Sequence, residues 1–367
     1  MSRSQVSWRQ FDFWLLALVA FLCVFGIAAI QSAIAGNAEL AGSAQRQVIF
    51  AVVGIALAIL LSLTDYHLWA AASRPLYLGT IVLLLALLIL GNARFGSARW
   101  FSVGGLLLQP SEFAKIVLIL VLADYLSKQE KDGHQLGWIV RSLLLTAGIA
   151  VCVFLQPNLS TTIVMFVLWA ALLWFSGVPV KYFVAMIVIG AVVAFAAFPL
   201  LQDYQQNRVL NFLSQGQGSA QGEAYNIQQA QIAIGSGGWF GLGYGHGTQG
   251  QLRFLKVRHT DFIFSVVAEE FGFIGAVGLL AVFALVILRC FRAGRRANDT
   301  FGALIAYGVG VLILFQTVVS VGVNLGLMPA TGLTLPFISY GGSSLMAFLM
   351  GIGLVESVAA RRKPLSA

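Results

Sequence analysis

Charged side chains are scarce in this chain. Asp, Glu, Lys and Arg together make up only 10% of its 367 residues, whereas 59% of the residues are hydrophobic and the mean hydropathy is +0.87. Soluble domains carry about 25% charged residues, so this composition excludes an ordinary soluble globular protein. It predicts a polytopic membrane protein, in which each polar residue within a span is rare enough to be interpreted individually.

Cysteine and acidic residues are also few. The three cysteines, Cys23, Cys152 and Cys290, lie far apart in apolar runs, which excludes a disulfide framework and a cysteine-based metal motif. Lys and Arg outnumber Asp and Glu by 22 to 14, which gives a formal charge of +8. In a membrane chain this excess fits cytoplasmic loops and contact with anionic lipid or phosphate. We therefore expect membrane lipids as partners and no nucleic acid.

Long apolar runs are what the chain has in place of a soluble domain. A span needs about 20 apolar residues, and the first run has that length without a small-residue cleavage site, so it is interpreted as a span rather than a signal peptide. We predict an all-α polytopic fold in which residues 1–367 form one transmembrane domain. Its ten expected helices cover 11–31, 46–63, 76–91, 112–127, 138–155, 161–176, 180–201, 262–289, 302–325 and 341–360.

Lys and Arg are concentrated in alternate links between these spans. Because basic residues are retained on the inner side of a membrane, this distribution places both termini in the cytoplasm. The longest non-spanning piece, 202–261, then lies outside, between the seventh and eighth helices. Its part 223–234 is helix-forming with a sparse apolar stripe, which predicts an interfacial helix on the outer surface. The chain is thus expected in the cytoplasmic membrane with an active site that faces outward.

One carboxylate marks the junction between this loop and the eighth span. Asp261 is the only Asp or Glu within 224–268, and Lys256, Arg258 and His259 come shortly before it. A Thr-Asp pair ahead of an apolar run is a helix-start signal, so one interpretation is an N-cap. The other is a reactive carboxylate, which the nearby cations and the helix dipole keep ionised and which accepts a proton once substrate excludes water.

A second group of polar residues is expected on the same side. Glu112 and Lys115 are three residues apart at the start of a helix, so they share one face and are expected to pair, or to lie at the mouth of an outward cavity. Trp100 is an interfacial anchor or part of the cavity wall. Arg46 alone would be a snorkelling anchor. Together with Lys115 and Arg258 it would form a cationic clamp that fits a pyrophosphate.

Two glycine-rich stretches interrupt the apolar pattern. The stretch 235–249 contains a weak GxGxxG-like match, but no βαβ unit surrounds it, so dinucleotide binding is rejected. A compact loop, or a backbone that approaches a ligand or partner closely, fits it better. The stretch 326–344 ends in two helix-breaking glycines, Ser343 and Ser344. Its amides and these two hydroxyls are expected to face a cavity, unless the small residues form a packing seam.

Two further acids, Glu269 and Glu270, fall about two turns inside the eighth span. Acids inside a membrane are functional candidates, and pairing with Gln316 or Asn324 is the alternative. His246 and His259 lack the spacing of a metal site, so no metal ligands are predicted from the residues.

An outward cavity rich in cations, with one exposed acid, suits a particular chemistry. Nucleotides are not normally available outside the cytoplasm, so a group transfer there draws its energy from its substrate. A lipid-linked pyrophosphate sugar meets this need: the pyrophosphate contacts Arg and Lys, and Asp261 removes the proton of the acceptor hydroxyl. A single base with a good leaving group supports direct displacement with inversion.

Four runs of this sequence strongly resemble one known family. They are RHTDFIFSVVAEEFGFIG from Arg258, QPSEFAK from Gln109, GLTLPFISYGGSS from Gly332 and GHGTQGQLRFL from Gly245, and the similarity to the SEDS family extends over essentially the whole chain. This resemblance implies a peptidoglycan glycosyltransferase that polymerises lipid II on the outer face of the cytoplasmic membrane, with undecaprenyl pyrophosphate as leaving group. It also implies a class B penicillin-binding protein as partner, docked on the seventh and eighth helices and the loop 202–261.

The resemblance assigns roles to residues of this chain. Asp261 matches the essential acid and would be the general base. The residues expected to bind substrate or line its cavity are Arg46, Trp100, Glu112, Lys115, Arg258, His259 and Ser343. Arg258 before His259, with short tails, is more similar to the RodA branch, which acts in cell elongation and shape, than to the FtsW branch.

Other readings stay open. The family usually reads QPDLGT where this chain has Gln156-Pro-Asn-Leu-Ser-Thr161, so any role of an acid at position 158 is in doubt. The alternatives are a division-specific FtsW paralogue, a lipid II flippase that uses Glu269, Glu270 or Asp124, and a scaffold for the crosslinking enzyme. The sequence does not specify a cofactor; a divalent cation, Mg²⁺ or Mn²⁺, bridging pyrophosphate and Glu112 is one option.

Overall fold

The computed structural model describes residues 10–37, 40, 42–90, 92–94, 97–103, 106–128, 136–200, 205–206, 210, 223–248 and 258–361. Each of the ten predicted segments coincides over most of its length with one helix, which confirms the all-α polytopic fold. Within this part of the chain, seven of the helices are both long and apolar enough to cross a membrane. The ten helices are α1 (Phe13–Ala33), α2 (Ser43–Leu63), α3 (His67–Leu90), α4 (Pro110–Lys128), α5 (Leu136–Leu155), α6 (Leu159–Phe175), α7 (Val180–Ala197), α11 (Ile263–Arg295), α12 (Thr300–Asn324) and α13 (Gly342–Ala360).

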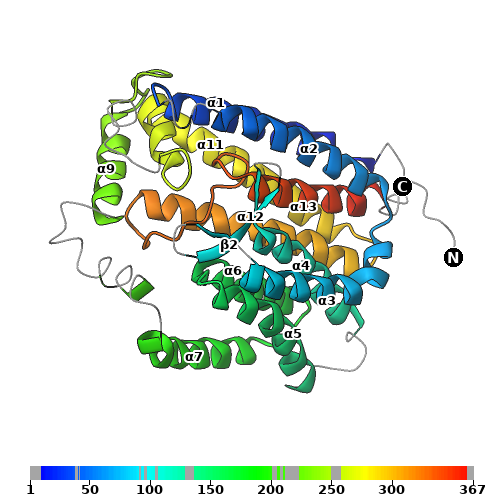
Figure 1. Cartoon of the computed structure of the whole chain (residues 1–367). Coiled ribbons are helices and arrows are strands. Elements are labelled where there is room, and N and C mark those ends of the chain that lie inside the picture. The colour runs from blue at the N-terminus through cyan, green and yellow to red at the C-terminus, as the bar shows by residue number, and fades with distance from the viewer. Residues whose placement is uncertain are drawn as a thin grey trace.

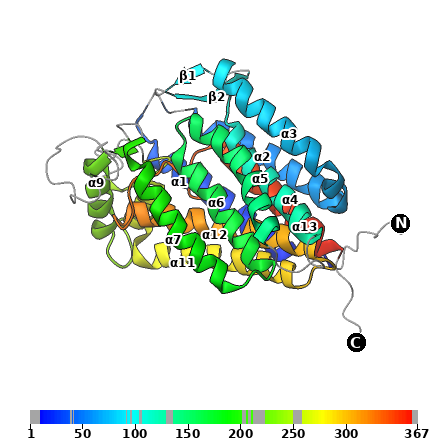
Figure 2. The ribbon, with the colours of Figure 1, turned by 90° about the horizontal axis from the view of Figure 1, so that it is seen from below.

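The helices form one bundle around α12 and α13 (Figure 1, Figure 2). In the 18-residue part of α13 that is long enough to cross a membrane, 94% of the residues are buried inside the protein, against 17% in the corresponding part of α3. A Cβ added at Gly353 of α13 would lie 2.5 Å from the carbonyl oxygen of Ala58 in α2, so these two backbones are in close contact. The outer helices keep large apolar side chains exposed, as expected of surfaces that lipid covers. The core is therefore set by small residues that let inner helices approach.

The first and last helices of the bundle meet at one end. The backbone amide of Asp12 donates to Glu356 Oε2 at 3.1 Å. The carboxylate of Asp12 pairs with Arg289, with 3.0 Å between Oδ1 of Asp12 and Nη1 of Arg289. The ten predicted crossings require this placement, because a chain that crosses an even number of times returns to its starting side.

A further helix, α9 (Glu223–Ser236), lies across the opposite end of the bundle (Figure 1). Gln231 Nε2 of α9 donates to the carbonyl oxygen of Leu325, just past α12, at 3.0 Å. The predicted helix at 223–234 is thus present, and it runs crosswise to the spanning helices as an interfacial helix does. Most of the remaining loop, including Arg253 and Lys256, lies outside the described residues.

Two local features differ from the sequence prediction. The link between α3 and α4 forms a small antiparallel sheet of β1 (Asn92–Arg94), β2 (Ser97–Val103) and β3 (Leu106–Leu108). The strands β1 and β3 have only three residues each, and two adjacent aromatic residues, Trp100 and Phe101, interrupt the alternation in β2. The helix α3 begins at His67 rather than at residue 76, because it continues through Pro75. A proline inside a membrane helix is tolerated when neighbouring groups satisfy the freed backbone.

The long helix α11 is broken at Gly272, whose φ of 68° and ψ of −169° are non-helical. The glycine-rich stretch closes on this break as a compact loop. The amide of Leu242 donates to the carbonyl oxygen of Glu269 at 3.0 Å, and the amide of Phe273 donates to that of Gly238 at 2.8 Å. The compact-loop interpretation is confirmed, and the backbone that the glycines admit belongs to α11 itself.

The close contact between the glycine-rich loop and the break in α11 predicts that Gly→Ala substitutions in the loop lower stability by amounts that depend on position. Gly241 has a φ of 80°, and its added Cβ would lie 2.1 Å from the carbonyl oxygen of Glu270. Gly245 has a φ of 75° but no atom within 4 Å of the added Cβ. We expect Gly245→Ala to cost about 1–2 kcal/mol for its left-handed backbone alone, and Gly241→Ala to cost clearly more. Thermal unfolding in detergent checks this; equal losses would contradict the close contact.

Candidate active site

The predicted reactive carboxylate lies on a short turn ahead of α11. Residues 258–262 form this turn, and Asp261 is partly exposed whereas the next residues, from Phe262 to Glu270, are buried. The N-cap position of α11 is occupied by Phe262, without a side-chain capping bond. The interpretation of Asp261 as the N-cap is therefore wrong, and its position one residue before the cap leaves it at the boundary of the buried core.

The carboxamide of Asn324 holds this turn in place. Its Nδ2 donates to the carbonyl oxygens of Asp261 and Ser320, both at 2.8 Å. Its Oδ1 accepts from the amide and the hydroxyl of Ser265, at 3.0 and 2.6 Å. Asn324 is fully buried, so all its hydrogen-bonding capacity is used in joining the end of α12 to the start of α11.

The loop before α13 pairs with the same turn. Ser339 Oγ donates to the carbonyl oxygen of Thr260 at 2.7 Å, and the amide of Tyr340 donates to that of His259 at 2.9 Å. The stretch 326–344 thus forms one wall of the candidate site through Ser339 and Tyr340, whereas Ser343 and Ser344, which were expected to face a cavity, are buried.

A glutamine of α2 completes this wall. Gln47 Nε2 donates to the carbonyl oxygen of Ser339 at 3.1 Å, and Gln47 Oε1 accepts from the amide of Gly341 at 3.2 Å. The side chain is buried next to Arg46, which is exposed on the first turn of α2. Gln47 and Asn324 were not predicted as site residues. Their signal in the sequence is an amide side chain in an otherwise apolar helix, which requires internal partners.

The three cations of the expected pyrophosphate clamp do not lie open together. Arg46 is exposed, but Lys115 is 1% and Arg258 3% exposed. The guanidinium of Arg258 donates through Nε to the carbonyl oxygen of Ala33, so it ties the turn to the end of α1. In this conformation Arg46 is the cation of the three that solvent reaches.

Glu112 and Lys115 form a buried ion pair. Lys115 Nζ lies 2.7 Å from Glu112 Oε2 and 5.7 Å from the centroid of the Phe348 ring in α13. The predicted pairing is confirmed, but the pair is enclosed between α4 and α13 rather than open at a cavity mouth. Both charges belong to α4, so the pair compensates each of them inside the bundle, at the cost of desolvating two charges.

The remaining predicted residues take different positions. Ser343 is buried, and its Oγ accepts from the amide of Gln109 at 2.8 Å, so it joins the start of α4 to that of α13. Trp100 is partly buried in β2, opposite Asn92 of β1. His259 is partly buried beside Tyr340, with ring centroids 5.7 Å apart. Burial first, and then the charge of Arg258, hold the pKa of His259 below its usual value, so its ring is neutral at pH 7.

The buried acids of α11 and the residue at position 158 each have a hydrogen-bond partner. Ser32 Oγ donates to Glu270, and Thr248 Oγ1 donates to Glu269 Oε1 at 3.0 Å. The alternative that these acids pair with Gln316 or Asn324 is wrong. Asn158 is the N-cap of α6, where its Oδ1 accepts from the amide of Thr161 at 3.3 Å. A neutral amide oxygen serves this cap, so the missing charge does not disturb the helix start.

The contacts of Asn324 predict how the turn responds to mutation. Asn324→Leu leaves the polar groups that the carboxamide satisfies without hydrogen-bond partners. We therefore expect a loss of at least about 2 kcal/mol in stability and faster deuterium exchange in 258–262. Gln316→Leu in the same helix is the control, because its buried amide has no hydrogen-bond partner among the described residues. Its removal should be neutral or stabilising. Unfolding in detergent and exchange mass spectrometry check both; similar behaviour of the two variants would contradict this role.

The buried ion pair predicts a stability pattern of its own. Glu112→Gln leaves the Lys115 charge buried without its partner, which costs about 3–5 kcal/mol. The double variant Glu112→Gln/Lys115→Met should recover most of this loss. Lys128→Gln is the matched control on the same helix: Lys128 pairs with Asp124 at 2.6 Å but is 61% exposed, so its loss should cost below about 1 kcal/mol. An unrecovered double variant in thermal unfolding would contradict the pairing argument.

Comparison with known proteins covers nearly the whole chain. Residues 9–364 match the FtsW/RodA/SpoVE family, described as cell cycle protein. A probable peptidoglycan glycosyltransferase FtsW of Hydrogenovibrio crunogenus is 36% identical over 366 residues, which cover 96% of this chain and 93% of that protein. The peptidoglycan glycosyltransferase MrdB of Escherichia coli is 35% identical over 359 residues, which cover 96% of this chain and 94% of its own.

Solved structures of similar sequence identity share the fold over nearly the whole chain. A chain of a peptidoglycan synthase complex that coordinates polymerization and crosslinking matches with a TM-score of 0.81 and 32% identity, over 96% of this chain and 98% of that one. The rod shape determining protein RodA of Thermus thermophilus matches with a TM-score of 0.73 and 32% identity, over 97% and 99% of the two chains. With both FtsW and MrdB among its relatives, this chain belongs to the FtsW/RodA/SpoVE, or SEDS, family of multi-pass membrane proteins and is a peptidoglycan glycosyltransferase.

Proposed function

We propose that the chain polymerises lipid II into glycan strands on the outer face of the cytoplasmic membrane, with Asp261 as general base. The observation that carries this proposal is the position of Asp261. It is partly exposed at the end of the bundle opposite Asp12 and Glu356, and its backbone is fixed by Asn324. A base that acts on an incoming hydroxyl needs both access and a fixed orientation.

The proposed step is a single displacement. The carboxylate of Asp261 accepts the proton of the acceptor hydroxyl, whose oxygen forms the new bond to the anomeric carbon. The bond from that carbon to the pyrophosphate oxygen breaks, and undecaprenyl pyrophosphate leaves with its negative charge. Inversion follows because no covalent enzyme intermediate intervenes. Arg46 is the exposed cation that the leaving pyrophosphate can meet first. Lys115 and Arg258 would need a conformational change to reach it, because both are buried.

A divalent cation, Mg²⁺ or Mn²⁺, remains part of the proposal. Within the described residues no three His, Cys, Asp or Glu side chains cluster closely enough to hold a metal ion. Glu112, expected to bridge such an ion, does not fit that role because its carboxylate is buried against Lys115. A cation carried on the pyrophosphate, with water as its other ligands, fits these residues better.

We further propose a class B penicillin-binding protein as partner, docked on α7, α11 and the loop 202–261. The helix α7 presents a row of uncovered apolar side chains, with Ile187 71% and Phe195 86% exposed. Lipid or a partner's membrane helix can cover such a face. The similar solved complex couples polymerization and crosslinking, which supports this choice. Most of the loop lies outside the described residues.

The direct test is lipid II polymerisation by the purified chain with its partner, read on a gel. We expect Asp261→Asn to bind lipid II but to make glycan about 10²–10⁴-fold more slowly, because a general base contributes about that factor. Asp65→Asn is the control: this partly exposed acid lies at the opposite end of the bundle, next to His67, and should keep wild-type activity. Full activity of Asp261→Asn would refute the proposal.

Two further arms separate the alternatives. A flippase would translocate labelled lipid II in proteoliposomes, keep that activity in Asp261→Asn and lose it in Glu270→Gln. A scaffold would tolerate both changes.

We also propose the elongation role, supported by Arg258 ahead of His259. We expect the chain to restore rod shape in cells depleted of their elongation polymerase. It should not restore division in cells depleted of FtsW. The reverse pattern would assign the division role.

A further inference from the structure

A cavity of about 710 Å³ lies between α3, α4 and α5, away from the candidate active site. Its lining includes Asp124 and Lys128, near the end of α4, whereas Glu112 and Lys115 lie near its start. The nine residues from Lys115 to Asp124 separate the two regions by about 13 Å along the helix axis. The cavity is therefore distinct from the site around Asp261.

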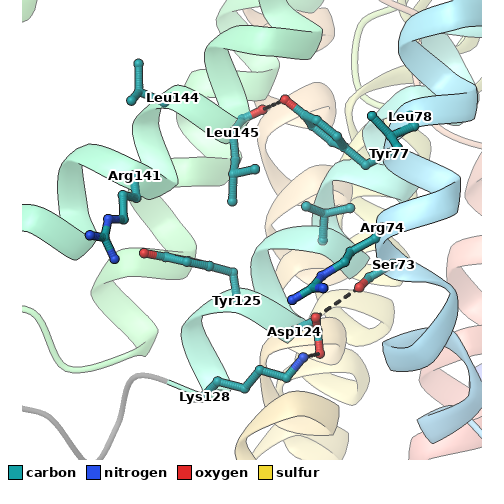
Figure 3. Close-up of a pocket in the computed structure, with 11 residues that line it drawn as sticks. Ser73, Arg74, Tyr77, Leu78, Asp124, Tyr125, Lys128, Arg141, Leu144 and Leu145 are labelled. Atoms are coloured by element: carbon teal, nitrogen blue, oxygen red, sulfur yellow. Dashed lines mark hydrogen bonds and ion pairs between the residues drawn. The ribbon is translucent and has the colours of Figure 1, made fainter.

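The polar side of this cavity carries an excess of positive charge (Figure 3). Its one acid, Asp124, is already satisfied: Lys128 Nζ lies 2.6 Å from one carboxylate oxygen, and Ser73 Oγ donates to the other at 2.9 Å. Arg74 and Arg141 then remain as cations without a second acid among the lining residues. Figure 3 shows them on opposite sides of the cavity, with Arg141 next to the Tyr125 hydroxyl.

The other side of the cavity is apolar. Leu78 of α3 and Leu144 of α5 line it and are 62% and 64% exposed, so they face the surroundings of the bundle as well. The hydroxyl of Tyr77 donates to the carbonyl oxygen of Leu145 at 3.0 Å, which links α3 to α5 at one end of the cavity (Figure 3). A ligand here meets guanidinium groups with one part and hydrocarbon with another.

This arrangement selects one class of ligand. A guanidinium recognises a phosphate through two parallel N–H donors, and basic pockets between membrane helices on the cytoplasmic side suit anionic lipid headgroups. We propose that the cavity binds an anionic glycerophospholipid of the inner leaflet. Its phosphate lies between Arg74 and Arg141, and an acyl chain lies along Leu78 and Leu144. The inner-leaflet assignment rests on the proposed orientation of the chain, not on its glycosyl transfer.

Neighbouring ligand chemistries fit less well. Free inorganic phosphate would use the two guanidinium groups but leave the leucine side of the cavity without a partner. Phosphatidylcholine carries the same phosphate together with its own ammonium group, which two arginines would repel. Phosphatidylglycerol combines a net negative charge with acyl chains, so it is the probe of choice.

The test is native mass spectrometry of the full chain in detergent, with an equal mixture of phosphatidylglycerol and phosphatidylcholine of the same acyl chains. We expect wild type to retain phosphatidylglycerol selectively. Arg74→Gln/Arg141→Gln should weaken that binding by about thirtyfold, from about 1 kcal/mol for each arginine. Arg74→Lys/Arg141→Lys keeps the charge without the planar fork and should fall between the two.

Matched controls keep the result specific. Arg292→Gln/Arg295→Gln removes two exposed arginines from the last turn of α11, outside the cavity, and should leave binding unchanged. Asp261→Asn should also bind lipid as wild type does, so this inference and the proposed catalytic role can fail separately. Equal loss in the α11 control, or full binding by Arg74→Gln/Arg141→Gln with its fold intact by thermal unfolding, would overturn the site. Displacement of the lipid by millimolar inorganic phosphate would replace it with a soluble-anion site.

Discussion

The geometry around Asp261 depends on the carboxamide of Asn324. Inside an apolar bundle every polar backbone group needs a partner, and the turn before α11 leaves several without a helical one. Asn324 satisfies a carbonyl group within that turn, two groups of Ser265 in α11 and a carbonyl group of its own helix, so α11 and α12 cannot shift against each other without breaking these bonds. The orientation of the turn that carries Asp261 is therefore a property of the packed helices.

The same constraint explains the glycine-rich loop. A break at Gly272 frees backbone groups of α11, and the loop from Gly237 supplies amides and carbonyls that take their places. Side chains on the loop would block that approach. This stretch of glycines, which resembles a ligand-binding motif in the sequence, thus stabilises the kinked helix that carries Glu269 and Glu270.

The ionisable residues are divided between the two ends of the bundle. One end carries Asp261 and, on the first turn of α2, the exposed Arg46. The other brings Asp12, Arg289 and Glu356 together and holds the cation-lined cavity of α3, α4 and α5. At one surface the exposed Arg46 can meet a pyrophosphate, as proposed above, and at the other Arg74 and Arg141 can bind a lipid phosphate, as inferred above.

The sequence by itself determined the ten spans, the helix at α9, the pairing of Glu112 with Lys115 and the position of Asp261 at a helix junction. Each follows from local information: a run of apolar residues, a spacing of three, or a lone carboxylate next to such a run. The tertiary structure alone decided that Lys115, Arg258 and Ser343 are buried, and that Gln47 and Asn324 fix the site. Burial and these contacts join segments far apart in the chain, such as Gln47 and Ser339, and no periodicity or spacing within one segment encodes which distant backbone group a polar side chain will meet.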